Sequence, residues 1–337
     1  MFDFIVGTSN GVMQFRDSGI TLHCLSEYRI SAVHVDGADD SFLLAGSYGQ
    51  GLFRSEDGGE HWSQVSDGLT APAIRTFAPD PFENGAILAG TEPGRIFRSH
   101  DAGVSWEGLE EIARLPRADQ WYLPYSPRAG AVRNIFAPPA TDHLLASVEV
   151  GGLLDSADRG ATWTISPILG DTDIHHITGQ PDDPEVLYAA LGWASLKSVP
   201  VPPDSPPLGG IARSPDGGQT WTKFHSDYTR AVIVPPTRPD LLLAGPASKV
   251  GEGGRIEVSK DRGDSWLPAG DGIETPMADM VERFIAAPDG SILAICSGGG
   301  LFRSEPGEWH WKPVLPEGLS VKVESIAFTQ QPPDAAQ

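Results

Sequence analysis

Four arginines stand at the same place in four short segments of similar sequence. The segments are AIRTFAP, AVRNIFAP, YTRAVIVP and VERFIAAP, and the arginines are Arg75, Arg133, Arg230 and Arg283. A guanidinium group is always charged and donates paired hydrogen bonds to carboxylates and phosphates. Brought together, the four would recognise an anion. Alternatively, each would brace a neighbouring segment through a carboxylate or a carbonyl.

Three further segments share this pattern but carry other residues at the equivalent place. DIHHITG has His175, KVESIAF has Glu324, and RISAVHV has Ser31 with Arg29 two positions earlier. The adjacent pair His175 and His176 would point to opposite faces of a strand, so a shared metal ion is not expected.

A repeated motif supplies the elements that must position these residues. The pattern Ser-x-Asp-x-Gly-x-x-Trp occurs five times, as SEDGGEHW, SHDAGVSW, SADRGATW, SPDGGQTW and SKDRGDSW. A sixth copy, SEPGEWHW, keeps Ser304 and Trp311 but has Pro306 and Glu308 in place of Asp and Gly. Successive serines lie 44, 57, 58, 45 and 45 residues apart. A regular period of this length indicates a repeat architecture.

Each repeat contains four short strands, with the motif joining the third to the fourth, which is typical of a propeller blade. The predicted fold is therefore an all-β, seven-bladed β-propeller of four-stranded antiparallel blades in one domain, residues 1–337. N-terminal strands plus a C-terminal strand would close the ring. The predicted blades are 28–67, 73–109, 131–167, 172–225, 228–269, 280–315, and 2–26 with 319–329.

The motif resembles the Asp box, or BNR repeat, of the sialidase-like propeller superfamily. This superfamily includes sialidases, xyloglucan-cleaving endoglucanases, sortilin-type receptors and the photosystem II assembly factors. The resemblance implies a propeller whose boxes are structural, and a function in either glycoside cleavage or partner binding. The assembly factors also carry an arginine-rich patch. Sialidases usually have six blades and an Arg-Ile-Pro motif, whereas this chain has seven predicted blades and lacks that motif.

The motif itself favours a structural role. In SPDGGQTW, Asp216 can accept backbone N–H bonds across a turn, Gly218 permits a positive φ, and Trp221 can pack between blades. One catalytic site would not need five copies, so we expect a locked hairpin rather than a metal or sugar site.

Long insertions fall in the loops that would gather on the face opposite the motifs, where function is common. They span residues 109–130, 191–210 and 245–254. The first two carry aromatic and charged residues suited to stacking on a sugar or peptide, or to packing as a lid: Arg117, Asp119, Trp121, Tyr122, Tyr125, Arg128, Trp193 and Lys197.

Composition narrows the function classes. The formal charge of −21 argues against nucleic acid, whose binding needs a basic face. The sequence contains no stretch of eighteen apolar residues, so no transmembrane helix is expected. The start, MFDFIVGTSNG, indicates a strand rather than a signal peptide, so a cytoplasmic location is expected for the chain as it stands. No metal or cofactor is predicted, and a monomer is expected.

These observations favour a non-catalytic propeller that binds a partner at its loop-rich face and channel mouth. The partner would be a carbohydrate, an anionic small molecule, or a protein or peptide segment. The alternative is a glycoside hydrolase or lyase, for which paired carboxylates are needed. The candidate catalytic residues are then Asp119, Glu282 and Glu324.

Overall fold

The computed structural model describes residues 3–16, 19–36, 41–126, 129–201 and 203–329. Seven antiparallel sheets form the blades, six with four strands and one with an additional short strand. The predicted fold class, a seven-bladed β-propeller, is confirmed. Chain contacts divide the blades between two compact units. No helix among the described residues is long and apolar enough to cross a membrane.

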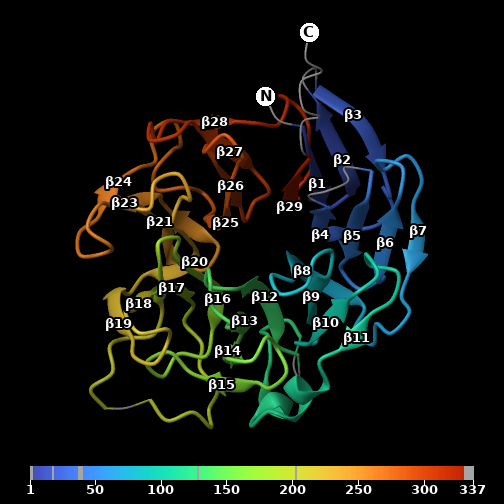
Figure 1. Ribbon diagram of the computed structural model, residues 1–337. Coiled ribbons are helices and arrows are strands. Elements are labelled where there is room, and N and C mark those ends of the chain that lie inside the picture. Colours follow the sequence, from blue (N-terminus) through green and yellow to red (C-terminus); the bar gives the residue numbers. More distant parts are fainter. Residues whose placement is uncertain (1–2, 17–18, 37–40, 127–128, 202, 330–337) are drawn as a thin grey trace. The chain divides into compact units, whose positions relative to one another are not determined.

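Unit 1 comprises Met1–Glu92, Ile96–Gly108 and Pro316–Gln337 and holds three blades. In one of them, β29 pairs with β1, so strands from the two ends of the chain share a sheet, as predicted (Figure 1). The strands, blade by blade, are β29 (Val323–Phe328), β1 (Phe4–Thr8), β2 (Gly11–Arg16) and β3 (Gly19–Cys24); β4 (Ile30–Val35), β5 (Leu43–Ser47), β6 (Leu52–Ser55) and β7 (Ser63–Val65); β8 (Ala73–Pro79), β9 (Ile87–Glu92), β10 (Ile96–Ser99) and β11 (Glu107–Gly108).

Unit 2 comprises Pro93–Arg95 and Leu109–Leu315 and holds four blades. Two short 3₁₀ helices, η1 (Glu110–Arg114) and η2 (Ala118–Gln120), precede them. The strands are β12 (Ala131–Phe136), β13 (Leu144–Glu149), β14 (Gly152–Ser156) and β15 (Thr164–Ser166); β16 (Ile174–Gln180), β17 (Asp183–Leu191), β18 (Gly210–Ser214) and β19 (Thr222–His225); β20 (Tyr228–Ile233), β21 (Leu242–Lys249), β23 (Glu257–Ser259) and β24 (Leu267–Pro268), with β22 (Glu252–Gly254) beside β21; β25 (Val281–Ala286), β26 (Ile292–Cys296), β27 (Leu301–Ser304) and β28 (Trp311–Pro313).

The second strand of each blade contains a continuous buried run, as in ILAGTE of β9 and LLASVE of β13. Such runs are expected where both faces of a strand are covered. Glycine in this strand lets the first strand of the next blade approach. A Cβ on Gly46 would lie 2.5 Å from Ile74 Cβ, and one on Gly245 would lie 2.6 Å from Val281 Cβ. Small residues at this place therefore set the spacing between blades.

The repeated motif forms a hydrogen-bonded hairpin, shown by the copy at Ser214. The Ser214 hydroxyl donates to Asp216 Oδ1 (2.9 Å) and accepts the Gly218 N–H (2.8 Å). Asp216 Oδ1 also accepts the Thr220 N–H (2.8 Å), and Gly218 has φ +95°. Hydrogen bonds from the residue four positions after the aspartate lower its pKa in every complete copy, to about 2 in Asp57, Asp101, Asp158 and Asp261.

The motif tryptophans join one blade to its neighbour. Trp221 packs against a buried cluster that holds residues of β13, β14, β16 and β17, and Trp106 belongs to a cluster shared by β5, β6, β8 and β9. In the sixth copy, Trp311 donates to the Ala269 carbonyl oxygen (2.7 Å), which lies outside its own turn. The motif therefore acts as a structural link between blades.

Candidate functional site

Each blade begins with a β-bulge near the start of its first strand, which breaks the pairing with the second strand. The extra residue is Ser31, Arg75, Arg133, His175, Glu282 or Glu324 in six blades, and lies within Arg230–Ala231 in the seventh. A bulge re-aims a side chain away from the regular pleat.

The register corrects the sequence alignment at one place. In β25, Val281 pairs with Cys296 and Arg283 pairs with Ile295, so Glu282 is the bulged residue and Arg283 is not. Arg283 Nη2 instead donates to the Arg133 carbonyl oxygen at 3.4 Å.

In unit 2 the bulged residues meet in one charged network. Glu282 accepts from Arg133 Nη2 at Oε1 (2.5 Å) and from Arg230 Nη1 at Oε2 (2.7 Å). Arg230 Nε also donates to the Tyr228 hydroxyl (3.0 Å), which lies 3.0 Å from His175 Nε2. Arg133 Nη1 lies 3.4 Å from Glu149 Oε2, at the end of β13. One glutamate thus bridges two arginines from different blades.

The network is built around ionised groups. Burial alone would raise the pKa of Glu282, but Arg230 and Arg133 hold it far below its usual range. Burial alone would lower the pKa of Arg133, but Glu149 and Glu282 raise it. Burial lowers the pKa of His176 to about 3, and the nearby Arg283 contributes to this shift. The charges therefore stabilise one another inside a mostly buried site.

Unit 1 has a related arrangement. The guanidinium groups of Arg29 and Arg75 each lie over the Tyr48 ring, at 4.4 and 4.6 Å from its centroid. Arg75 Nη1 lies 3.5 Å from Glu92 Oε2, and Arg29 Nε donates to Glu324 Oε1 at 3.0 Å. Carboxylates brace both arginines.

Two insertions of unit 2, residues 109–130 and 191–210, pack against each other. The Ser198 hydroxyl contacts Gln120 Oε1. Pro116 and Arg117 of the first insertion also line a small cavity with Leu196 and Val199 of the second. The two loops therefore present one combined surface, called here the loop surface.

The loop surface carries all the exposed tyrosine, tryptophan and phenylalanine side chains of the described chain. These are Tyr122 (36% exposed), Tyr125 (57%) and Trp193 (42%). Trp193 packs edge-on to Tyr228, with ring centroids 5.4 Å apart. Tyr125 contributes to the raised pKa of Arg133, after the larger effects of burial and the two glutamates. Exposed aromatics thus adjoin the charged network.

Trp121 does not belong to this surface, because it is only 2% exposed. Its side chain faces three glycines whose added Cβ atoms would lie 3.1–3.3 Å from it: Gly94, Gly130 and Gly151. It is therefore a core residue of the insertion. Asp119 lies on η2 and is exposed, Glu324 lies in unit 1, and Arg128 lies outside the described residues.

A buried ion pair anchors the second insertion. Asp171 Oδ2 accepts the Gly209 N–H (2.7 Å) and lies 3.4 Å from Lys223 Nζ, which donates to the Pro207 carbonyl oxygen (2.6 Å). Burial raises the pKa of Asp171 to about 7, against the opposing effects of Gly209 and Lys223. These bonds hold the end of the loop against its blade.

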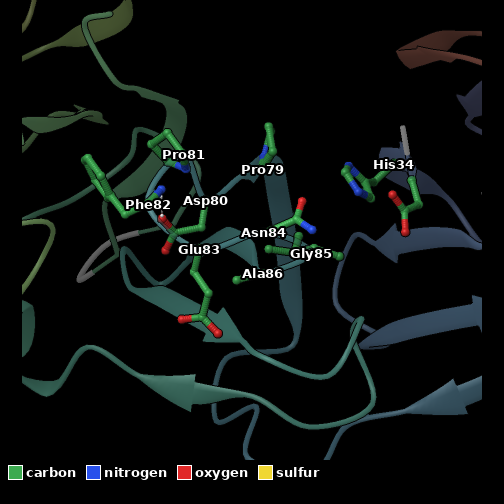
Figure 2. Close-up of a pocket in the computed structure, with 11 residues that line it drawn as sticks. His34, Pro79, Asp80, Pro81, Phe82, Glu83, Asn84, Gly85 and Ala86 are labelled. Atoms are coloured by element: carbon green, nitrogen blue, oxygen red, sulfur yellow. Dashed lines mark hydrogen bonds between the residues drawn. The ribbon is translucent and has the colours of Figure 1, made fainter. Parts of the chain in front are cut away.

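Unit 1 also has an open groove of about 530 Å³. Figure 2 shows His34 on one side and the β8–β9 turn, with Asp80, Pro81, Phe82 and Glu83, on the other. The turn is rigid because Asp80 Oδ1 accepts the Phe82 N–H (2.9 Å) and Asp80 Oδ2 lies 2.7 Å from Arg98 Nε. Asp80, in the wall of the groove, is therefore already paired.

Five residues of the two networks were missed from the sequence: Tyr48, Glu92, Glu149, Tyr228 and Asp173, whose Oδ1 lies 3.2 Å from His175 Nε2. A signal for three of them was present. The segments ILAGTE and LLASVE both end in glutamate, and Glu92 and Glu149 pair with the residues that stand two positions before the bulged arginines. Asp173 likewise stands two positions before His175.

No family model matches the chain, and no curated protein matches it. Solved structures of several propellers resemble it. An ancestral GH74 enzyme has 14% identity and a TM-score of 0.61, and the match covers 84% of this chain but only 38% of that enzyme. YCF48 bound to D1 peptide has 18% identity, a TM-score of 0.59 and coverage of 90% and 89%. Chaetomium thermophilum Sqt1 bound to the N-terminus of the ribosomal protein L10 has 12% identity, a TM-score of 0.58 and coverage of 93% and 84%. These likenesses show the fold, which enzymes and peptide binders share.

Proposed function

We propose that this chain is a non-catalytic propeller of the Asp-box type that binds a peptide segment of a protein partner on the loop surface. The observation that carries the proposal is the placement of Tyr122, Tyr125 and Trp193, the exposed aromatic side chains of the described chain, on two loops that touch. Tyrosine and tryptophan are enriched where partners bind, since each offers a large apolar area with few rotatable bonds.

The charged network supports the loop surface beside these aromatics. Arg133 and Arg230 already bind the Glu282 carboxylate, so in this proposal they position the surface and do not bind an anionic ligand themselves. Exposed cations on the loops, Arg117 and Lys197, favour a peptide that carries acidic residues beside its apolar ones. Two of the similar solved propellers hold peptides, which agrees with this class of partner.

The glycosidase alternative is less well supported. Such an enzyme needs a carboxylic acid whose pKa is raised and which reaches the scissile bond. Glu282 has the opposite property because two arginines keep it ionised. Asp171 has a raised pKa but is fully buried.

Two experiments separate the classes. A phage-displayed library of random twelve-residue peptides is selected against the full chain, and the same protein is assayed on a glycan array and a panel of fluorogenic glycosides. The proposal expects a shared peptide motif with aromatic and acidic residues, and no turnover of glycosides. Hydrolysis of a glycoside that survives mutation of Trp193 and is lost in Glu282→Gln would support the enzyme instead.

A further inference from the structure

Three metal-ligating side chains of unit 2 converge within the charged network, which Glu149 joins through Arg133 and His175 joins through Tyr228. Glu149 ends β13, Asp173 immediately precedes β16, and His175 is the bulged residue of that strand. One ligand atom from each lies within 4.8 Å of the others. Their side chains come from the ends of two neighbouring strands rather than from long loops, which fixes them before any ligand arrives.

These groups are buried and incompletely satisfied. Glu149, Asp173 and His175 are 6%, 5% and 4% exposed. Glu149 Oε2 and Asp173 Oδ1 have no hydrogen-bond partner in the described part of the chain, and their cationic neighbours are Arg133 Nη1 at 3.4 Å and His175 Nε2 at 3.2 Å. His175 Nε2 also lies 3.0 Å from the Tyr228 hydroxyl, which a metal ion would have to displace. Buried polar atoms are normally hydrogen-bonded, so unsatisfied ones in a single cluster indicate a missing ligand.

The spacing suits a divalent ion. His175 Nε2 lies 3.2 Å from Asp173 Oδ1. Two ligands held at about 2.0–2.1 Å from a tetrahedral zinc ion are roughly 3.3 Å apart. Gly192 closes one side, since an added Cβ would lie 2.0 Å from Asp173 Oδ2 and 2.8 Å from His175 Nε2. The pocket is therefore tight and lined by backbone.

The neighbouring Arg133 does not prevent Glu149 from binding a metal ion. Its short bond, 2.5 Å, goes to Glu282, whereas its Nη1 remains 3.4 Å from Glu149 Oε2, beyond an ordinary hydrogen bond. Glu149 can therefore turn to a cation while the bridge from Arg133 to Glu282 persists.

We propose that Glu149, Asp173 and His175 form a binding site for one divalent transition-metal ion, zinc or manganese, within unit 2. One imidazole and two carboxylates are ligands that both ions accept, and the imidazole disfavours calcium and magnesium. The ion would fix the start of β16 against the end of β13. This site adjoins the second insertion through Gly192, but the proposal does not rest on peptide binding.

The test uses the full chain, stripped with EDTA and titrated calorimetrically with zinc, manganese, calcium and magnesium chlorides. Zinc or manganese should bind with one ion per chain, and a hundredfold excess over Kd should raise the melting temperature by about 4 °C. Asp173→Asn and Glu149→Gln, which are nearly isosteric, should each weaken binding at least about tenfold.

The matched control is His61→Gln, because Asp57, Glu60 and His61 form an exposed cluster of the same composition. This control should bind as the wild type does. The proposal is overturned if the wild-type chain shows no saturable binding, if only calcium or magnesium binds, or if His61→Gln loses the ion while Asp173→Asn keeps it. If Asp173→Asn and Glu149→Gln fail to fold, the titration of His61→Gln decides, since loss of the ion in that variant would assign it to the exposed cluster and overturn the proposal.

Discussion

Replacing Glu282 tests whether the charged network stabilises unit 2. Its two oxygens accept charge-assisted bonds of 2.5 and 2.7 Å from Arg133 and Arg230. Each such bond contributes about 1.5–3 kcal/mol, and removing one partner of a buried pair costs about 3–5 kcal/mol. Glu149 still offsets part of the charge on Arg133, so Glu282→Gln should lower the free energy of unfolding at pH 7 by about 3 kcal/mol. Urea unfolding measures this, with the exposed Glu308→Gln as control.

The pH dependence gives the second half of this test. The arginines depress the folded-state pKa of Glu282, so its contribution is present above the unfolded pKa of 4.5 and is lost as the pH falls toward the folded value. At pH 3 the difference between wild type and Glu282→Gln should therefore shrink by about 2 kcal/mol. Equal urea midpoints at pH 7, or a difference that does not change at pH 3, would refute the reasoning.

Three further predictions concern the blades. Trp221→Ala should lower the free energy of unfolding by about 2 kcal/mol, less than the loss of a fully buried tryptophan, because this side chain is only partly buried. Peptide binding should be unchanged, and a stable variant that loses binding would contradict the structural role. Deleting residues from Ser320 onward removes β29 and leaves β1 with an open edge, so light scattering should report aggregation; a monomeric, equally stable truncation would disprove it. Burial lowers the pKa of His34 to about 4, so unfolded chains bind its proton first and stability falls as the pH drops from 6.5 to 4; His34→Gln should remove up to about 3 kcal/mol of that loss, and an unchanged pH profile would argue against it.

The repeat architecture could be predicted because its signals are local. A serine, an aspartate and a glycine within eight residues form hydrogen bonds to one another that close a hairpin. Gly46 is required because the first strand of the next blade packs directly against it. The pairing of β29 with β1 followed from counting strands, since the two ends of the chain supplied complementary parts of one blade.

The side-chain networks could not be predicted to the same depth. A one-residue bulge in β25 brings Glu282 into the bulged position that the alignment gave to Arg283, and this depends on pairing with β26. Trp121 is buried because Gly94, Gly130 and Gly151 meet around it from distant parts of the sequence. Both the bulge and the burial of Trp121 depend on tertiary contacts. The residue types were therefore apparent from the sequence, but the residues that they contact were not.

The central claim, that the loop surface binds a peptide, is tested most directly by one affinity ratio. The Kd of a selected peptide is measured by fluorescence anisotropy for wild type, Trp193→Ala and Leu267→Ala, the last being a comparably exposed apolar residue outside the loops. Loss of a central aromatic contact typically costs at least about 2 kcal/mol, so Trp193→Ala should weaken binding roughly thirtyfold while Leu267→Ala leaves it unchanged. Equal affinities for all three proteins, or a loss confined to Leu267→Ala, would contradict the account.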